Sequence, residues 1–478
     1  MTDAPTASIS DATRRMLPWL VAVAFFMESL DTTILNTAVP VIAHAMAITS
    51  LDMKSVLASY TMSLAVFIPI SGWMADRFGT RRVFSVAIGT FTLGSVFCGL
   101  STNVHELVAC RILQGCGGAM MVPVGRLTLV RAFPKFELVQ AMSFVAIPGL
   151  IGPMLGPVAG GFIVDYFDWR AIFFVNIPVG IVGLILVYLQ LPDYKAEETR
   201  PLDIVGLILF GAGLALLSYV LEIFGEHSLN AGEVSGLLAI AAALLIGYAW
   251  RAHATDYPLL QLALFRIRTF AISVSGGFFT RLGTGGVPFL LPLLYQEGLG
   301  LSPVQSGLLI TPQALAALST KFFMPNLLRR LGYRAILVSS TVALGFMLML
   351  FATVDLRTPI WLILVQAFCY GALASIRNTS MNTLAYADVP PERASNASSM
   401  ASTVQQLSMS FGVAIAGLTA AFFLPDRNHA SSGQIISGIH GAFLALGAFI
   451  ILSTIIFWRL KSDDGADEAQ VGHSHTIS

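Results

Sequence analysis

The chain is a succession of apolar runs, each around 20 residues long, separated by short polar stretches. A helix needs about 20 apolar residues to cross about 30 Å of hydrocarbon. Because lipid offers no hydrogen bonds, a spanning chain must satisfy its backbone within helices or a closed barrel. Strands of such barrels alternate polar and apolar residues over about ten positions, whereas these runs are continuous. The pattern therefore predicts an all-α polytopic membrane protein.

The composition excludes several classes of function. The 478 residues include 55% apolar and only 11% charged ones, and the 27 basic and 27 acidic residues give a net charge of zero. A nucleic-acid-binding protein would need a basic excess, and a soluble domain carries about 25% charged residues. The four cysteines lie in apolar runs, and we find no metal-ligand spacing, nucleophile triad or phosphate-binding loop. We therefore expect no enzyme, no metal site and no cofactor.

Fourteen runs are long enough to span a bilayer, and the loops between them leave no room for a soluble domain. A twelve-span interpretation would discard the seventh and eighth, but both are long and apolar, so we retain them. The predicted spans are 16–37, 55–74, 83–101, 106–129, 138–164, 170–191, 203–222, 234–252, 269–294, 304–325, 334–353, 359–384, 395–424 and 436–459.

The distribution of Lys and Arg predicts the orientation, because cytoplasmic loops carry the excess of these residues. With the N-terminus inside, eighteen lie on the inner side and four on the outer side, so we expect both termini in the cytoplasm. The inner residues are Arg14, Arg15, Arg77, Arg81, Arg82, Arg131, Lys135, Lys195, Arg200, Arg251, Arg266, Arg268, Arg329, Arg330, Arg334, Arg393, Arg459 and Lys461. The outer residues are Lys54, Arg170, Arg357 and Arg427.

A short repeat indicates internal duplication. Residues 76–81 follow the second span, residues 329–334 follow the tenth, and both contain Arg-x-Gly-x-Arg. Gly332 lies 253 residues after Gly79, more than half the chain, which suits two six-span units with an extra pair of spans between them. The predicted domains are a cytoplasmic tail (1–15), a six-helix bundle (16–191), a linker with two extra transmembrane helices (192–268), a second six-helix bundle (269–460) and a disordered cytoplasmic tail (461–478).

Four motifs carry a family resemblance. They are GWMADRFGTRR at 72–82, RILQGCGG at 111–118, GPMLGPVAGG at 152–161 and LDTTILNTAVP at 30–40. Together with WRAIF at 169–173 and NIP at 176–178, they resemble the major facilitator superfamily. Within it they resemble the fourteen-helix drug:proton antiporter branch (EmrB/QacA-like), and MMVPVGRL at 120–127 and QLSMS at 406–410 resemble its MdtD-type members.

The resemblance covers residues 15–460 and implies a fold and a function. It implies a major facilitator fold with two six-helix bundles and two inserted central helices. It also implies a multidrug exporter in the bacterial inner membrane, driven by the proton gradient without a cofactor. The expected partners are a small-molecule substrate, protons and the lipid bilayer, with no nucleic acid, and we expect a monomer.

Two motifs imply conformational roles. The loop at 72–82 implies a cytoplasmic latch that stabilises one access state, although a plain positive-inside loop is the alternative. The motif at 152–161 places glycines four apart on one helical face, which allows close helix approach, and its prolines weaken the helix; packing alone is the alternative. The latch residues are Gly72, Asp76, Arg77, Gly79 and Arg81, and the antiporter-motif residues are Gly152, Pro153, Gly156, Pro157, Gly160 and Gly161.

Seven charged residues fall within predicted spans and away from the ends of those spans: Glu28, Asp31, Arg111, Arg126, Arg281, Lys321 and Arg377. Each costs about 3 kcal/mol at the bilayer centre, so intramembrane charges mark functional sites by default. Glu28 and Asp31 share one helical face, and two close carboxylates tend to share a proton. We expect Asp31, Glu28 and Arg111 to couple proton movement to transport; a structural ion pair is the alternative.

The last six spans carry Arg281, Lys321 and Arg377 but no acid. A net-positive cavity favours an anion, so we expect an anionic or zwitterionic organic substrate such as a drug, carboxylate metabolite or metal chelate. Snorkelling or helix capping by Lys321 and Arg377 is the alternative. The predicted cavity residues are Arg126, Arg281, Lys321, Arg377, Asn36 and Gln405, with Thr280, Gln296, Asn378, Asn382 and Gln406 as further candidates. The competing functions are a non-transporting membrane subunit or sensor, and a proton-coupled importer.

Overall fold

The computed structural model describes residues 11–196, 199, 201–223, 230–424, 430–461 and 464. Residues 1–10 of the predicted N-terminal tail, and all of the predicted C-terminal tail except Lys461 and Asp464, lie outside these ranges. So do Arg200 and Arg427, which entered the orientation count. Within the described part of the chain, all regular secondary structure is helical.

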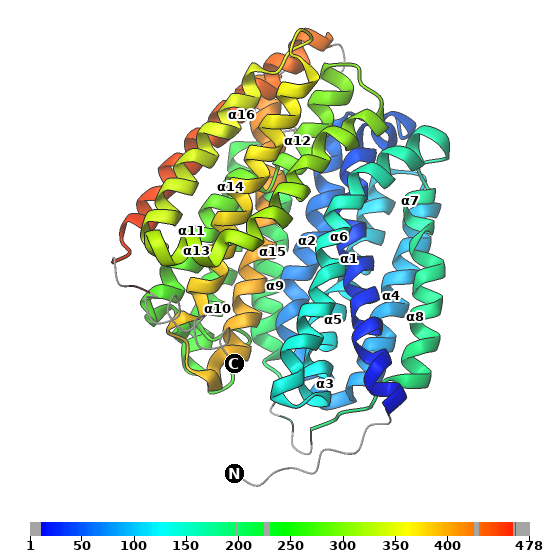
Figure 1. The fold of residues 1–478 in the computed structure, drawn as a ribbon, viewed down its shortest axis with the longest axis vertical. Helices are drawn as coiled ribbons and strands as arrows, with labels where there is room; N and C mark the ends of the chain where they lie inside the picture. The colour runs from blue at the N-terminus through cyan, green and yellow to red at the C-terminus, as the bar shows by residue number, and fades with distance from the viewer. Residues whose placement is uncertain are drawn as a thin grey trace.

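The first part of the chain forms a group of helices, drawn from blue to green in Figure 1. They are α1 (Asp11–Ala45), η1 (Ser50–Met53), α2 (Lys54–Phe67), η2 (Ile68–Ile70), α3 (Ser71–Phe78), α4 (Thr80–Leu100), α5 (Val104–Ala132), α6 (Lys135–Tyr166), α7 (Ala171–Phe174) and α8 (Asn176–Gln190). Among these helices, α1 packs against α6, and α5 packs against α2 and α4.

The rest of the chain forms two further helices and a second group. These are α9 (Ile204–Ile223), α10 (Ala231–Ala254), η3 (Leu262–Arg266), α11 (Arg268–Thr284), α12 (Val287–Leu293), η4 (Leu294–Gly298), α13 (Pro303–Leu350), η5 (Phe351–Thr353), α14 (Ile360–Ala387), η6 (Pro391–Arg393), α15 (Ala394–Phe423) and α16 (Ser432–Trp458). In this second group, α13 packs against α14 and α16, and α11 packs against α15.

The two groups meet mainly along the helix pairs α6–α13, α2–α15 and α1–α12. The additional helices α9 and α10 pack against each other, and α9 contacts α2 and α15, one helix from each group. An ion pair between Arg251 Nε and the buried Asp203 Oδ1, 2.6 Å apart, ties the end of α10 to the start of α9. Helix α9 therefore lies against the junction of the two groups, with α10 packed against it.

Twelve helical segments of the described chain are long and apolar enough to cross a membrane. The predicted count of fourteen is not confirmed, for two physical reasons. The tenth and eleventh predicted spans both lie in α13, a 48-residue element made of two helical segments joined by a non-helical turn at Gly332. The predicted span 269–294 is interrupted between α11, with 17 residues, and α12, with 7, so neither piece is long enough alone.

The internal repeat is visible in the backbone. Gly79 between α3 and α4 has φ 92° and ψ 146°, and Gly332, its counterpart in the repeat, has φ 73° and ψ 163°. This region of backbone space is essentially restricted to glycine. Both copies of the Arg-x-Gly-x-Arg pattern therefore make the same sharp turn, and in the second copy the turn kinks α13.

Replacing Gly332 by Ala should destabilise the protein by about 1–3 kcal/mol, because Ala must adopt a backbone conformation that its Cβ opposes. Thermal unfolding of the purified protein in detergent would measure this loss. Gly89→Ala is the matched control, since Gly89 lies within α4 and a Cβ there meets nothing within 4 Å. Equal unfolding temperatures for Gly332→Ala and Gly89→Ala would contradict the assignment of strain to this turn.

One residue counted in the outer loops lies elsewhere. Lys54 begins α2 and is 1% exposed, with its aliphatic stem against Gly417 of α15. Lys54, which was counted on the outer side, is therefore a buried residue at a helix end and not an exposed loop residue. Its single charge at the edge of an apolar run gave no sign that a second helix would cover it.

Candidate functional site

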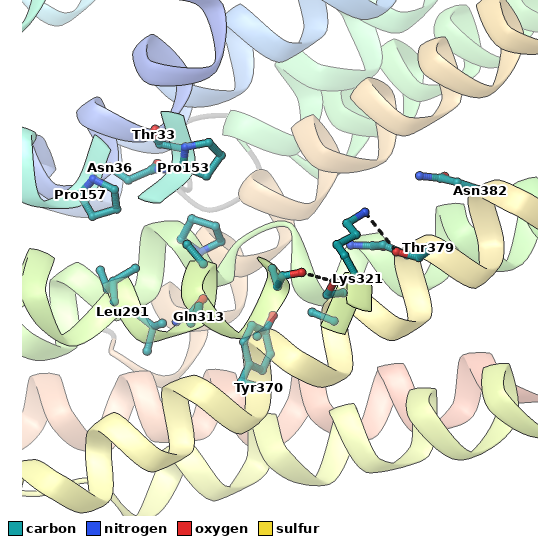
Figure 2. Close-up of a pocket in the computed structure, with 18 of the residues that line it drawn as sticks. Thr33, Asn36, Pro153, Pro157, Leu291, Gln313, Lys321, Tyr370, Thr379 and Asn382 are labelled. Carbon is teal, nitrogen blue, oxygen red and sulfur yellow. Dashed lines mark hydrogen bonds between the residues drawn. The ribbon is translucent and has the colours of Figure 1, made fainter. Parts of the chain in front are cut away.

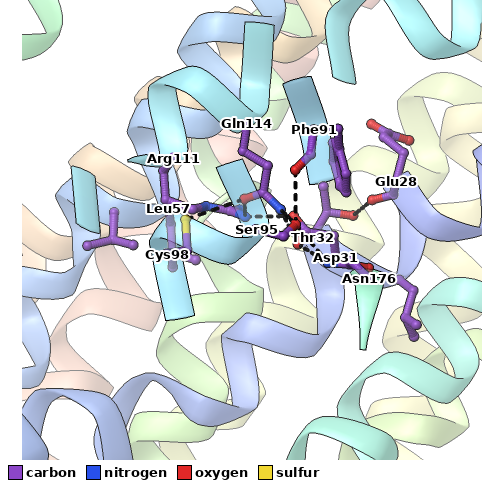
Figure 3. A network of polar contacts seen from close by, with 12 residues as sticks. Glu28, Asp31, Thr32, Leu57, Phe91, Ser95, Cys98, Arg111, Gln114 and Asn176 are labelled. Atoms are coloured by element: carbon purple, nitrogen blue, oxygen red, sulfur yellow. Dashed lines mark hydrogen bonds and ion pairs between the residues drawn. The ribbon is translucent and has the colours of Figure 1, made fainter. Parts of the chain in front are cut away.

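A buried ion pair lies at the centre of the first group of helices (Figure 3). Asp31 of α1 and Arg111 of α5 are each 1% exposed, and Arg111 Nη1 donates to Asp31 Oδ2 over 2.6 Å. The other carboxylate oxygen, Oδ1, accepts from Gln114 Nε2 at 2.8 Å and from Asn176 Nδ2 at 3.0 Å. Both oxygens of the carboxylate are thus hydrogen-bonded, which a buried charge requires.

Further polar groups hold this pair in place. Gln114 Nε2 donates to Ser95 Oγ at 2.7 Å, while Gln114 Oε1 accepts from Arg111 Nη1 at 2.6 Å. Asn176 also donates to Ser95, at 3.3 Å. The network joins α1, α4, α5 and α8, and sequence reasoning did not assign Ser95, Gln114 or Asn176 to it. Gln114 and Asn176 lie in the motifs at 111–118 and 176–178, which was the available signal.

Glu28 lies one helical turn before Asp31 and is only partly buried. Its carboxylate interacts electrostatically with Asp31 and with Arg126 of α5. Arg126 is exposed, and its guanidinium lies 5.4 Å from the ring centre of Phe25. The two acids of α1 therefore face different arginines of α5, as the fifteen-residue spacing of those arginines requires.

A cavity of about 470 Å³ lies between the two groups of helices (Figure 2). Its wall comes from α1 and α6 on one side and from α12, α13 and α14 on the other. Lys321 is the one charged residue among the described residues that line it, and its Nζ donates to Thr379 Oγ1 at 3.4 Å. The other polar lining residues are Thr33, Asn36, Thr37, Gln313, Tyr370, Ser375, Asn378, Thr379, Asn382 and Thr383.

The structure places only part of the predicted cavity set in this wall. Asn36, Lys321, Asn378 and Asn382 line it. The predicted residues that lie away from it are Arg126, Arg281, Arg377, Gln405, Gln406, Thr280 and Gln296. Gln296 instead donates to the Thr37 backbone oxygen at 2.8 Å, and Thr280 bonds within α11 and to Ser453.

Arg377 shows why the residues that line the cavity could not be predicted from the sequence. Successive residues of a helix point about 100° apart, so Asn378 faces the cavity while Arg377 is 1% exposed inside the bundle. Its Nη2 donates to Asn378 Oδ1 at 2.9 Å, and its Nε and Nη1 have no hydrogen-bond partner among the described residues. Arg281 is near enough to interact with it electrostatically. Arg377 therefore does not snorkel; it lies behind the cavity wall.

The predicted latch residue Asp76 pairs with the end of α5. Arg131 Nη2 donates to Asp76 Oδ1 at 2.5 Å. The linker after α8 runs along the same loop, since Thr80 N donates to Tyr194 O at 3.0 Å and Ala196 N to Asp76 O at 3.2 Å. Among the other latch residues, Arg77 reaches Thr199 at 3.4 Å and Arg81 Nε reaches Leu191 O at 2.6 Å. A Cβ on Gly72 would meet nothing within 4 Å, so its place in the motif has no packing explanation.

The antiporter motif on α6 packs against both groups of helices. Cβ atoms on Gly152, Gly156 and Gly160 would lie 2.6 Å from Ser29 Oγ, 2.0 Å from Thr33 Oγ1 and 2.4 Å from the Ile34 backbone oxygen, all on α1. A Cβ on Gly161 would lie 2.3 Å from the Pro303 oxygen of α13.

The remaining motif residues, Pro153 and Pro157, line the cavity. Gly307 of α13 approaches the Pro157 backbone oxygen equally closely, 2.2 Å from an added Cβ. Gly307 was missed from the sequence, where it stands outside any motif.

Comparisons with known proteins agree with this architecture. The family model of the Major Facilitator Superfamily matches residues 21–413 and 273–475. The chain is 42% identical, over 93% of both chains, to the "Putative multidrug resistance protein MdtD" of Serratia proteamaculans (strain 568). It is 41% identical to the protein of the same name from Escherichia coli (strain K12), over 97% of both chains.

Among solved structures, the POT family transporter PepTSo has a TM-score of 0.69 at 14% identity and covers 96% of this chain and 98% of its own. That likeness shows the fold alone. The family match and the MdtD-type relatives, together with the helical bundle and its motifs, confirm the resemblance found in the sequence. This chain is a multi-pass membrane transporter of the major facilitator superfamily.

Proposed function

We propose that the protein exports small organic compounds in exchange for protons, by alternating access of two helix bundles. The observation that supports this most directly is the buried Asp31–Arg111 pair. Asp31 lies on α1, the helix whose Thr33 and Asn36 line the cavity, so a change at the pair acts on the cavity wall. The relatives are named for multidrug resistance, which favours efflux over import.

The coupling works through the charge of Asp31. A proton on its carboxylate removes the attraction to Arg111, and this attraction offsets the cost of burying both charges. Because α1 also packs tightly against the glycines of α6, a shift of α1 moves both the cavity wall and the contact with α13. Binding of a proton and binding of substrate thereby become alternatives, which is the requirement for exchange.

Contacts between the two groups gather at the end of the molecule away from α3, where α7 and α12 lie in Figure 1. There Gln296 bonds Thr37, Asp165 Oδ2 accepts from Val304 N at 3.1 Å, and Ser50 bonds Glu297. The apolar core at this end includes residues of both groups. Of the other three cores, two have buried residues from one group each, and the third joins Met62 of α2 to residues of α9 and of the second group. These contacts support a state that is closed on the outer side.

The topology that fits this mechanism has fourteen crossings. The helix α13 makes two crossings that meet at Gly332, and α11 to η4 together make one. The bundles are then residues 16–191 and 269–460, linked by α9 and α10, with both termini in the cytoplasm and the protein in the bacterial inner membrane. We expect a monomer that uses the proton gradient and no cofactor.

An anionic or zwitterionic substrate suits the cavity. Lys321 is the charged group in its described wall. Arg377 lies behind that wall and interacts electrostatically with Arg281, and neither arginine has an acidic partner among the described residues. A dehydrated site of positive potential attracts anions and disfavours cations. A carboxylate drug, a carboxylate metabolite or a metal–carboxylate chelate would satisfy this chemistry.

The function is tested with protein reconstituted in liposomes under an imposed pH gradient and offered matched anionic and cationic organic compounds. Substrate movement opposite to the proton flux supports the exporter. Movement with the proton flux would favour the importer, and no movement of any compound in the panel would favour the non-transporting subunit or sensor.

Replacing Lys321 by Gln should reduce transport of the anionic compounds by about tenfold or more, the effect of losing one charge-assisted hydrogen bond of about 1.5–3 kcal/mol. Transport of neutral compounds should change little. Lys461→Gln is the control, because Lys461 is exposed and far along the chain from the cavity. Equal anion transport by both variants would overturn the assignment of Lys321 to the substrate site.

A further inference from the structure

Tyr60 of α2 lies in the proton site, although it belongs to none of the sequence motifs. Its side chain is completely buried, and the Arg111 guanidinium lies 4.2 Å from the centre of its ring. An arginine at this distance over an aromatic face is attracted by the ring quadrupole, more strongly where water is absent. Arg111 is therefore held from two sides, by the Asp31 carboxylate and by the Tyr60 ring.

The α5 motif that carries Arg111 also forms the slot for Tyr60. A Cβ on Gly115 would lie 2.8 Å from the Tyr60 backbone oxygen, and a Cβ on Gly118 would lie 2.8 Å from the Tyr60 hydroxyl oxygen. Neither distance occurs for real Cβ atoms, and the rigid ring can move little in a packed core. Gly118 thus makes room for the tyrosine side chain, while Gly115 allows the backbone of α2 and the Ser63 side chain to approach α5.

The hydroxyl of Tyr60 has no hydrogen-bond partner among the described residues, although it is buried. Leaving a buried hydroxyl unpaired is costly, so such a group calls for an explanation. The charged groups around it are Glu28 and Asp31 of α1 and Arg111 of α5. Beyond them lie Arg126 of α5, which faces Glu28, and the Cys98 thiol of α4, which faces Arg111.

The hydrogen bonds that Asp31 already makes explain why the Tyr60 hydroxyl has no partner in this state. Both carboxylate oxygens already accept bonds, from Arg111, Gln114 and Asn176. When a proton binds at Oδ2, that atom becomes a donor and the carboxyl loses its charge, so the charge-assisted bond from Arg111 is weakened. The new O–H then needs an acceptor. The Tyr60 oxygen interacts electrostatically with Asp31 and has unused lone pairs, so it can serve as one.

We propose that Tyr60 is a positioning residue of the proton site, whose ring retains Arg111 and whose hydroxyl accepts the hydrogen bond of protonated Asp31. The inference rests on the proposed proton coupling. No covalent bond changes other than the binding of the proton at Asp31 Oδ2. Tyr60 stabilises the protonated state through its hydroxyl and prevents Arg111 from leaving the site while the ion pair is open.

The test measures transport in liposomes across a range of external pH for wild type, Tyr60→Phe and Tyr60→Leu. Phe keeps the ring and loses the hydroxyl, so the protonated state is less stable and the pH midpoint of transport should move about 0.4–1 unit to the acidic side, the equivalent of one neutral hydrogen bond. Leu loses the ring as well and should also lower the maximal rate, since Arg111 is no longer retained.

Gly118→Ala provides an independent arm, because its Cβ collides with the hydroxyl oxygen itself. The single variant should transport poorly, and the double variant Gly118→Ala with Tyr60→Phe should recover most of the rate of Tyr60→Phe alone, since the colliding atom is gone. Gly89→Ala, where a Cβ has open space, is the matched control. Size-exclusion profiles in detergent establish that each variant is folded.

A wild-type pH midpoint in Tyr60→Phe would overturn the role of the hydroxyl, and equal maximal rates for Tyr60→Leu and Tyr60→Phe would overturn the role of the ring. Both outcomes leave the proposed function intact, provided that the wild type responds to the pH gradient. Wild-type transport that ignores the pH gradient would overturn the proposed function and this inference together.

Discussion

Replacing Asp31 by Asn should abolish proton-driven export, because the neutral amide cannot take up and release a proton. It should also destabilise the protein by about 3–5 kcal/mol, since Arg111 is left as an uncompensated buried charge. The two effects are separable. Transport against a pH gradient in liposomes reports the first, and thermal unfolding in detergent reports the second.

A second substitution distinguishes coupling from stability. Combining Asp31→Asn with Arg111→Gln removes both charges and should recover most of the lost stability, but no proton-driven export. Asp168→Asn is the control for the loss of an ion pair as such. Asp168 pairs with Arg170 at 3.4 Å on the surface, so that variant should lose at most about 1 kcal/mol. Intact proton-coupled export by Asp31→Asn would remove Asp31 from the mechanism.

Replacing Gly161 or Gly307 by Ala should open the junction between α6 and α13. An added Cβ would lie 2.3 Å or 2.2 Å from a backbone oxygen of the opposite helix, and backbone atoms in a packed seam cannot move aside. Overpacking of this kind costs about 1–3 kcal/mol, which shifts the balance between access states by roughly 5- to 150-fold. We expect a shift away from the state that is closed on the outer side.

Accessibility of an engineered cysteine in the cavity to a reagent added from outside measures this shift. Gly149→Ala is the matched control, because Gly149 lies on α6 and a Cβ there meets nothing within 4 Å. Gly156→Ala adds a further comparison, since it disturbs α1 within the same group of helices. Unchanged accessibility in both Gly161→Ala and Gly307→Ala would show that the α6–α13 contact does not control access.

Much of the fold could be read from the sequence, because the cost of placing a residue in lipid is set by that residue and its neighbours along the helix. The apolar runs predicted where helices lie, including the pair α9 and α10. The spacing of the Arg-x-Gly-x-Arg patterns predicted a duplication, which the positive φ of Gly79 and Gly332 makes visible. The number of membrane crossings was harder to predict from the sequence. Helix α13 is helical on both sides of its kink, and one predicted span is interrupted between α11 and α12.

The sequence by itself determined which residues had to be explained. Charges such as Asp31, Arg111 and Arg377 cannot face lipid at an acceptable cost, so each required a partner or a cavity. Only the tertiary structure decided between these outcomes. It paired Asp31 with Arg111, 80 residues away, placed Lys321 in the cavity wall and put Arg377 behind that wall. It also supplied the groups that no charge or motif marked as partners, Ser95 and Tyr60.

The physical reason is that burial depends on residues close together in the sequence, whereas the choice of partner depends on residues far apart in it. Burial of an apolar or charged residue depends on local composition, which a single sequence displays. The choice of partner depends on which helix faces meet, and that follows from close packing among helices far apart in the chain. A rotation of one residue, about 100°, separates Asn378 in the cavity wall from Arg377 in the bundle interior.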